Sequence, residues 1–218
     1  MSLGLTVVTH TCPFLGRDIT KCVDSVKAAL PPGAKHMIIE LEYEIETFEA
    51  ARFDSMKLDD IVVFVDDDDY ISPNSLKYCL SALEETDAGI AFTNEVIVNS
   101  DGTQQDSKHA MLYEYMYNNP TSIHHMTAFN TKYVTERPSL LFQKYKCSIE
   151  WMMKVDAVVN AGKAIHIPIV GYYWVQHSKQ HHRDPAYQKQ HKEHNSLVKE
   201  EMLQWGKLSG PIPHWTIR

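Results

Sequence analysis

The sequence predicts a single α/β domain with a mostly parallel sheet flanked by helices. Strand and helix patterns alternate over the first 85 residues, which is typical of doubly wound sheets. Residues 61–65 are apolar at every position, as expected for a parallel strand that is covered on both faces. The 218 residues are enough for one large core and contain no repeat, low-complexity tract or linker. We therefore expect one domain over residues 1–218.

The elements of the first half follow from local patterns. In the first helix, apolar side chains recur on one face, and Pro31 to Gly33 end the helix. Ser72 and Pro73 supply an N-cap and a first-turn proline for a later helix. The expected elements are strands at 4–10, 35–41 and 60–65, a helix within 16–33, a weaker helix at 44–58 and a helix that starts at residue 72.

The second half predicts a hairpin, two helices and late strands. Residues 88–104 indicate a strand or a hairpin that turns at Asp101 and Gly102. Ser148 can cap a helix that runs to Ala161, with Gly162 at its C-terminal end. A pair of strands is expected at 163–177 and a C-terminal helix at 185–206.

The composition is that of an ordinary globular protein, with 44% hydrophobic and 22% charged residues. No apolar run reaches the roughly 18–20 residues of a membrane span, and the N-terminus lacks the basic segment of a secretory signal. Cys12, Cys22, Cys79 and Cys147 are widely spaced and form no C-x-x-C pair, which favours reduced thiols. These features predict a cytoplasmic protein.

Charge is distributed unevenly along the chain. The net charge is −7, but residues 163–218 carry eight Lys and Arg against four Asp and Glu, together with seven of the twelve histidines. This basic end could be a surface that binds a phosphate-bearing partner, or it could simply be a solvated basic helix.

Four carboxylates, Asp66 to Asp69, directly follow the most apolar strand. Ligands of open α/β sheets bind outside the carboxyl ends of the strands. Alternation would direct Asp66 and Asp68 into one site and Asp67 elsewhere. Two such carboxylates suit a hard divalent cation, which would also relieve their repulsion. The alternative is a solvated acidic turn ahead of a helix N-terminus, and this alternative explains Asp69 best.

Three segments carry a resemblance to family 2-type glycosyltransferases of the GT-A fold. The segment "IVVFVDDDDYISPNSL" resembles the metal-binding D-x-D segment of that family. The segment "LTVVTHTCPFLGRDITKCVDSV" is similar to its first strand, nucleotide loop and helix. The later segment "SIEWMMKVDAVVNAGKAIHIPIVGYYWVQHSKQHH" resembles its acidic residue before Trp, its glycine and its His-containing loop. The resemblance implies a nucleotide-sugar-binding half at 1–95, an acceptor and catalytic half at 96–184, and a C-terminal helix and tail at 185–218.

The resemblance also implies the chemistry and its residues. A sugar would leave a nucleotide diphosphate donor with the help of Mn²⁺ or Mg²⁺, and Glu150 would act as the general base in an inverting transfer. The metal ligands would be Asp68, Asp66 and a histidine, His182 among the candidates. The donor contacts would be Thr9, His10, Thr11, Glu40, Arg52, Asp66, Asp67, His177, His181 and Arg183. The acceptor contacts would be Trp151, His125 and Thr127.

Two departures from the family pattern keep alternatives open. The Asp-rich turn after the second strand is absent, so Glu40 or Glu42 would have to replace it, and only Glu150 remains of the Glu-Asp pair before Trp151. A non-catalytic module of the same fold that binds nucleotide sugars or divalent ions is therefore an alternative. A nucleotidyl- or phosphotransferase is a weaker one, because no Gly-rich phosphate loop is present. The acceptor is open among saccharide, lipid-linked sugar, protein, small molecule and hydroxylated DNA base.

Overall fold

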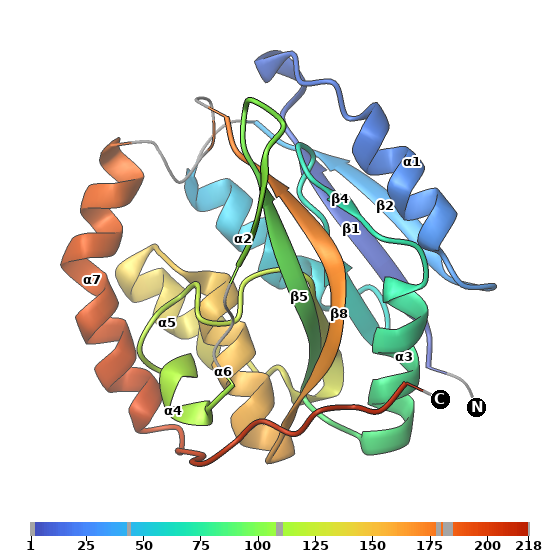
Figure 1. Cartoon of the computed structure of the whole chain (residues 1–218). Coiled ribbons are helices and arrows are strands. Elements are labelled where there is room, and N and C mark those ends of the chain that lie inside the picture. The colour runs from blue at the N-terminus through green and yellow to red at the C-terminus, as the bar shows by residue number, and fades with distance from the viewer. Residues whose placement is uncertain (1–2, 43–44, 108–110, 178–179, 181–184, 218) are drawn as a thin grey trace.

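We describe the protein from a computed structural model, which covers residues 3–42, 45–107, 111–177, 180 and 185–217. An eight-stranded sheet runs through the molecule in the order β2-β1-β3-β7-β5-β8-β4, with β6 paired to β5 (Figure 1). The strands are β1 (Leu5–Thr11), β2 (Lys35–Glu40), β3 (Ile61–Phe64), β4 (Tyr70–Ile71), β5 (Ile90–Val98), β6 (Gln104–Asp106), β7 (Thr127–Asn130) and β8 (Ala164–Val175).

The sheet combines parallel and antiparallel pairs. β1 pairs in parallel with β2 and β3, and β5 pairs in parallel with β8. β7, which the sequence did not predict, lies antiparallel between β3 and β5 and joins the two parallel groups. The predicted α/β fold is confirmed, and the sheet is mixed rather than mostly parallel.

Helices cover both faces of the sheet. Val26 and Leu76, from α1 (Thr20–Ala29) and α3 (Ser75–Thr86), are buried in one cluster with Val7 and Val63 of β1 and β3. The second cluster lies on the other face, under the remaining helices (Figure 1). These helices are α2 (Ile45–Ser55), α4 (Tyr113–Met116), α5 (Arg137–Tyr145), α6 (Ile149–Ala161) and α7 (Pro185–Leu203).

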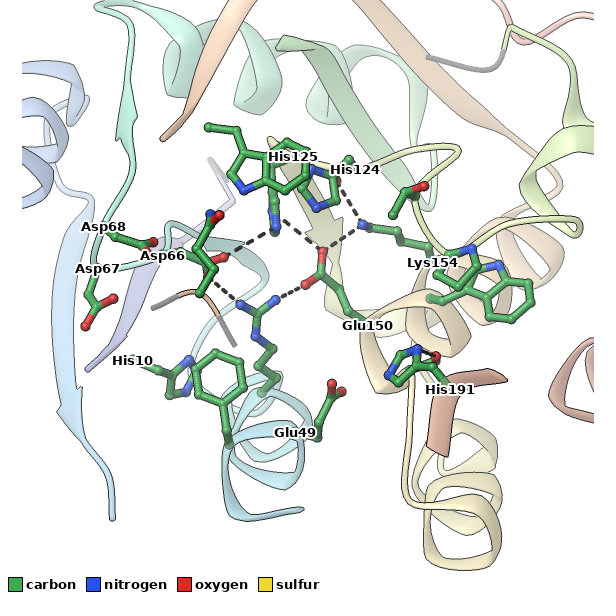
Figure 2. A pocket seen from close by; sticks show the side chains of 18 of the residues that line it. His10, Glu49, Asp66, Asp67, Asp68, His124, His125, Glu150, Lys154 and His191 are labelled. Carbon is green, nitrogen blue, oxygen red and sulfur yellow. Dashed lines mark hydrogen bonds and ion pairs between the residues drawn. The ribbon is translucent and has the colours of Figure 1, made fainter. Parts of the chain in front are cut away.

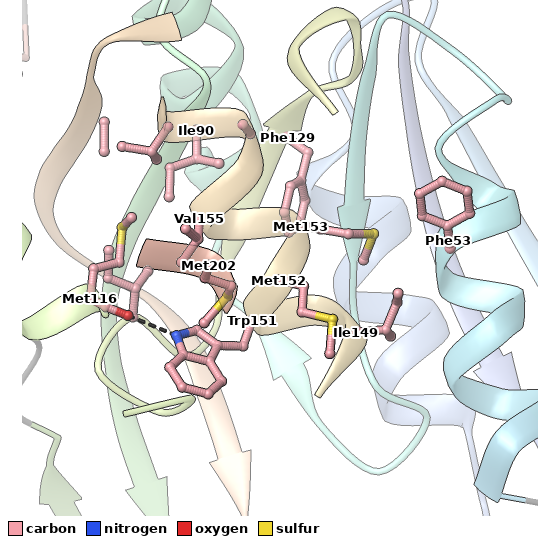
Figure 3. Close-up of a cluster of buried hydrophobic side chains, with 14 of the residues drawn as sticks. Phe53, Ile90, Met116, Phe129, Ile149, Trp151, Met152, Met153, Val155 and Met202 are labelled. Carbon is pink, nitrogen blue, oxygen red and sulfur yellow. Dashed lines mark hydrogen bonds between the residues drawn. The ribbon is translucent and has the colours of Figure 1, made fainter. Parts of the chain in front are cut away.

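The second cluster is centred on α6. Met153 and Val155 of α6 lie with Ile90 of β5 and Phe129 of β7, all of them fully buried (Figure 3). Burying one such side chain stabilises a fold by about 1.5–3 kcal/mol. This packing fixes α6 on the sheet and thereby fixes the position of its first turn.

Two local predictions, the hairpin turn and the glycine at the end of α6, are confirmed. β6 pairs antiparallel with β5 beyond Asp101 and Gly102, and Gly102 has a positive φ of 83°, as the predicted hairpin requires. Gly162 follows α6 with a φ of 73°, which fits a helix C-cap. The four cysteines are buried and free. Within the described residues, no helix is long and apolar enough to cross a membrane.

Two local predictions are wrong. The segment 163–177 contains one long strand, β8, instead of a strand pair, and its register against β5 shifts between Thr93 and Glu95. Ser72 does not cap a helix, because α3 begins at Ser75 after Asn74 in a left-handed conformation. The Ser72 hydroxyl instead donates to the Val170 carbonyl of β8 at 2.7 Å.

Candidate active site

A cavity of about 470 Å³ opens beyond the carboxyl ends of β1 and β3. Its walls come from elements far apart in the sequence: the segment after β1, α2, the acidic turn after β3, the loop 119–125, the first turn of α6, and α7. This is the place where open α/β sheets bind ligands. Figure 2 shows Glu150 between the acidic turn on one side and Lys154 and His191 on the other.

The acidic turn, Asp66 to Asp69, is a hydrogen-bonded turn in which the Asp69 N–H donates to the Asp66 carbonyl at 3.1 Å. Asp66, Asp67 and Asp68 all line the cavity. The prediction that Asp67 points elsewhere is therefore wrong. Strand alternation does not apply here, because β3 ends at Phe64 and the chain turns directly afterwards.

Asp69 points away from the cavity and is only 1% exposed. Its carboxylate accepts hydrogen bonds from the Tyr172 hydroxyl and the Val175 N–H, both at 2.7 Å. Burial, together with the charges of Asp68 and Asp66, raises the pKa of Asp69 well above its ordinary value. The expectation of a solvated acidic turn is wrong for this residue, which is an internal anchor of the turn.

Arginines compensate the carboxylates that line the cavity. Arg17, from the segment between β1 and α1, lies 2.5 Å from Asp67 and 3.3 Å from Asp68. Thr11, at the end of β1, donates to Asp67 at 2.8 Å. Burial opposes the charge on Arg17, but Asp67 and Asp68 raise its pKa. The expected donor contact Thr11 therefore lies beside the acidic turn, and Arg17 is a site residue that the sequence did not reveal.

Asp68 has the chemistry of a metal ligand. Its carboxylate lies 2.7 Å from the Nε2 atom of His177, and burial and the charge of Asp66 raise its pKa. A carboxylate beside a histidine nitrogen suits a divalent cation such as Mn²⁺. Among the described residues, no group of three His, Cys, Asp or Glu side chains is arranged to hold a metal. His181, His182 and Arg183 lie outside the described residues.

Glu150 lies in the first turn of α6, as the sequence predicted. Arg52 forms an ion pair with Glu150 and, through its other terminal nitrogen, with Asp66, so it bridges the acidic turn and α6. His125 also lies near both carboxylates, 3.6 Å from Asp66 and 3.8 Å from Glu150. The predicted acidic residues Asp66 and Glu150 thus have Arg52 and His125 as common neighbours.

Lys154 is a second neighbour of Glu150 and is 2% exposed. Its ammonium group lies 2.7 Å from Glu150 and donates to the carbonyls of Ile123 and His124, each at 2.8 Å. Burial and the charge of Arg52 lower the pKa of Lys154 to about 7. Lys154 was not predicted as a site residue, although a lysine inside the apolar run "WMMKVDAVV", four residues after Glu150, was the available signal.

α2 holds the first turn of α6 in a second way. Glu49, one helical turn before Arg52, accepts a hydrogen bond from the Ile149 N–H at 3.0 Å. The expected cap, Ser148, stands at the N-cap position, but its hydroxyl instead contacts α7, 3.1 Å from His191 Nδ1 and 3.0 Å from Asn195 Oδ1. A buried glutamate from another helix therefore replaces the serine as the cap of α6.

The remaining donor candidates divide into two groups. His10 lines the cavity beside the rings of Phe48 and Phe64, at 5.7 Å and 5.8 Å between centroids. Burial, and then the charge of Arg52, lowers the pKa of His10 to about 4, so its ring is neutral at pH 7. Thr9 lies behind the cavity wall, 3.0 Å from His36, and neither Thr9 nor Glu40 lines the cavity.

The acceptor candidates also differ in position. His125 lines the cavity, whereas Thr127 is buried on β7 and donates to the His124 carbonyl at 3.1 Å. Trp151 borders the cavity, but its indole N–H donates to the Met116 carbonyl at 2.7 Å within the core (Figure 3). Trp174 of β8, which was not predicted as a site residue, also lines the cavity.

A family model and several solved structures match parts of this chain. The family model described as Glycosyl transferase family 2 matches residues 51–146, which include the acidic turn. A comparison of the sequence with curated proteins finds no match.

Crystal structures of S. aureus TarS have a similar fold. The structure of TarS 1–349 matches with a TM-score of 0.59 and 16% identity, over 79% of this chain and 60% of that chain. The complex of TarS 1–349 with UDP-GlcNAc also has a TM-score of 0.59, with 14% identity over 93% of this chain and 72% of that chain. The chain thus spans about three fifths of the first of these relatives. The family match covers residues 51–146 with the acidic turn, and the likeness to TarS shows that this chain shares the α/β fold of those structures.

Proposed function

We propose that this protein transfers a sugar from a nucleotide diphosphate donor to an acceptor hydroxyl, with a divalent cation at the acidic turn. The observation that carries the proposal is the convergence of the acidic turn and Glu150 on one cavity, where Arg52 contacts both. The complexes of TarS with UDP-GlcNAc and with UDP favour a uridine diphosphate donor for this chain as well.

The donor diphosphate would lie at the acidic turn. Asp68 and His177 would hold a Mn²⁺ or Mg²⁺ ion there, with Asp66 as a third candidate ligand. When bound, such an ion stabilises the negative charge that develops on the leaving diphosphate. Arg17 lines this part of the cavity, and its guanidinium would attract the phosphate groups of the donor.

Glu150 would act as the general base. The acceptor oxygen forms a bond to the anomeric carbon while its proton passes to the Glu150 carboxylate. The bond between the anomeric carbon and the diphosphate oxygen breaks, and its electron pair leaves with the diphosphate. Attack from the face opposite the leaving group inverts the anomeric centre. Arg52 and Lys154 favour the ionised carboxylate, which is the form that a base requires.

The test is Glu150→Gln, measured with UDP-GlcNAc and UDP-glucose in the presence of Mn²⁺. Loss of a general base lowers the rate of transfer by about 10²–10⁴-fold. We expect UDP release to fall by that factor while calorimetry finds the donor affinity within about threefold of that of the unchanged protein. Equal turnover by both proteins would contradict the assignment of Glu150.

A non-catalytic nucleotide-sugar-binding module remains the second candidate. The observation that favours it is that both oxygens of Glu150 already have cationic partners, Arg52 and Lys154. Donor binding without any UDP release, by the unchanged protein and by Glu150→Gln alike, would establish this second candidate in place of the first.

A further inference from the structure

The cavity continues past Glu150 to a second end that is built mainly by α7. Gln188, His191 and Asn195 recur on α7 at helical spacing, and all three line the cavity. The Ser148 hydroxyl contacts both His191 and Asn195, so this end lies two residues from Glu150 along the chain. Figure 2 shows His191 on the side of Glu150 opposite the acidic turn.

The loop 119–121 completes this end of the cavity. Lys199 of α7 donates to the Asn118 side chain at 2.7 Å, which holds the loop against the helix. Asn119 and Thr121 line the cavity and are hydrogen-bonded to each other at 2.9 Å. We name this set the α7 end, and its polar members are Asn119, Thr121, Ser148, Gln188, His191 and Asn195.

The α7 end differs in chemistry from the acidic turn. Its polar groups are amides, hydroxyls and one imidazole, and the charged lining residues that border it are Lys154 and Glu49, whose carboxylate accepts a hydrogen bond from the Ile149 N–H. The ammonium group of Lys154 lies next to Glu150 and donates to that carboxylate and to two carbonyls, which uses its three protons. Amides and hydroxyls both donate and accept hydrogen bonds, as do the hydroxyl groups of a sugar.

We propose that the α7 end is the acceptor subsite and that the acceptor is a neutral saccharide bound by Gln188, His191 and Asn195. This inference rests on the proposed function and extends it to the acceptor class. A saccharide hydroxyl here lies next to Glu150, gives up its proton to that carboxylate and bonds to the anomeric carbon as the diphosphate leaves. A phosphate-rich acceptor such as duplex DNA needs Lys and Arg contacts, which the described residues of the α7 end do not supply.

The experiment compares acceptors and variants in the presence of UDP-GlcNAc or UDP-glucose and Mn²⁺. The acceptor panel contains neutral methyl glycosides and disaccharides, heparin fragments as anionic saccharides, and hydroxymethylated duplex DNA. The variants are Gln188→Ala and Asn195→Leu, and the matched control is Lys192→Ala, an exposed position on α7 outside the cavity lining. UDP release and mass spectrometry of the product measure transfer.

We expect transfer to at least one neutral glycoside. Each of the two variants should raise KM for that glycoside about 3- to 10-fold, as loss of one neutral hydrogen bond does, and Lys192→Ala should leave KM unchanged. Donor affinity, measured separately, should not change in either variant. Asn195→Leu also removes the hydrogen bond from Ser148, which precedes α6, and so can shift that helix. Gln188 is exposed, so Gln188→Ala tests the subsite independently.

Other outcomes overturn the inference. Transfer to DNA or heparin fragments but not to neutral glycosides contradicts the acceptor class. An unchanged KM in both variants contradicts the location. Donor binding with UDP release to water and no glycoside product contradicts the inference while the proposed function stands. No donor binding at all overturns the proposed function and the inference with it.

Discussion

Arg52 is the residue on which the charge balance of the cavity depends most. It is 5% exposed and pairs with Asp66 and Glu150, two carboxylates from different elements. Arg52→Met would leave both carboxylates close together without this counter-charge, and breaking a largely buried ion pair is strongly destabilising. We expect the free energy of unfolding in urea to fall by about 3 kcal/mol, the lower end for a buried pair, because the Asp66 side chain is 30% exposed.

The matched variant is Arg52→Lys. It keeps the positive charge but lacks the planar fork that reaches two carboxylates at once, so its effect should be smaller than that of Arg52→Met. Equal stability of Arg52→Met and the unchanged protein would contradict the bridging role of this arginine.

His10 makes the stability of the protein sensitive to pH. The pKa of His10 is lowered from 6.5 to about 4 in the folded protein, mainly by burial. As the pH falls below 6.5, the unfolded chain takes up a proton on His10 that the folded protein does not accept until about pH 4. The free energy of unfolding therefore decreases through this window, by about 2 kcal/mol between pH 7 and pH 5 from this residue.

His10→Phe should remove this contribution. The phenyl ring suits a site between Phe48 and Phe64, and the Ser55 hydroxyl keeps its hydrogen bond to the Ala51 carbonyl at 2.7 Å. Urea unfolding at pH 7 and pH 5 should show a smaller difference for His10→Phe than for the unchanged protein. The same pH dependence in both proteins would contradict the effect assigned to His10.

At the scale of elements, the position of α6 on the sheet determines where Glu150 lies. A methyl group at Gly89, just before β5, would lie 2.1 Å from the Ala157 carbonyl oxygen of α6. Gly89→Ala should therefore push α6 outward, lower the free energy of unfolding by about 1–3 kcal/mol and reduce transfer.

Gly102 provides the contrast. A methyl group there meets no atom within 4 Å, but φ is +83°, so Gly102→Ala should cost about 1 kcal/mol from backbone strain alone. The rate of transfer should be unchanged in Gly102→Ala, because the hairpin lies outside the cavity lining. Full transfer activity in Gly89→Ala would contradict the link between helix position and Glu150.

The sequence predicts most elements and the central acidic residues, because their patterns are local. β3 and the acidic turn are visible as an apolar run followed by aspartates, and Glu150 is visible at the start of a helix that Ser148 precedes and Gly162 follows. β7 was not predicted. Its four residues are buried, and the strands that pair with it, β3 and β5, come from distant parts of the chain, so no local pattern marks it as a strand. The antiparallel pairs in the centre of the sheet were missed for the same reason, because β7 forms them with β3 and β5.

The partners of the acidic residues were harder to predict than the residues themselves. Arg17 reaches the acidic turn across 50 residues of sequence, and Lys154 was hidden inside an apolar helix. Trp151 was expected to face an acceptor, but its indole is largely buried in the core, where its N–H donates to the Met116 carbonyl. Such pairings depend on the fold, which a single sequence pattern does not contain.

At the scale of the whole molecule, ligand binding should depend on the nucleotide and the cation together. The carboxylates already pair with Arg17 and Arg52, so a divalent cation alone should bind weakly at the acidic turn. A bound diphosphate adds negative charge at the same place and should therefore strengthen binding of the cation. We expect Mn²⁺ alone to shift Tm only slightly, and UDP with Mn²⁺ at about 100 times Kd to raise Tm by about 5–10 °C.

Removal of the cation is the control for this prediction. EDTA added after UDP and Mn²⁺ should return Tm to its initial value, and Asp68→Asn should weaken the combined shift. An equal shift with UDP in EDTA would contradict the role of Asp68 and His177 as cation ligands.

The hydroxyl of Tyr172 has a consequence for the energetics of association. It donates to Asp69 and accepts from the Asp66 N–H at 3.2 Å, so one rigid aromatic side chain secures both ends of a four-residue turn. The conformational entropy of this segment is therefore lost when the polypeptide folds and not when the nucleotide arrives. Binding of the nucleotide therefore does not include the entropy cost of ordering this turn, as in a ligand-binding loop that is already rigid before the ligand binds.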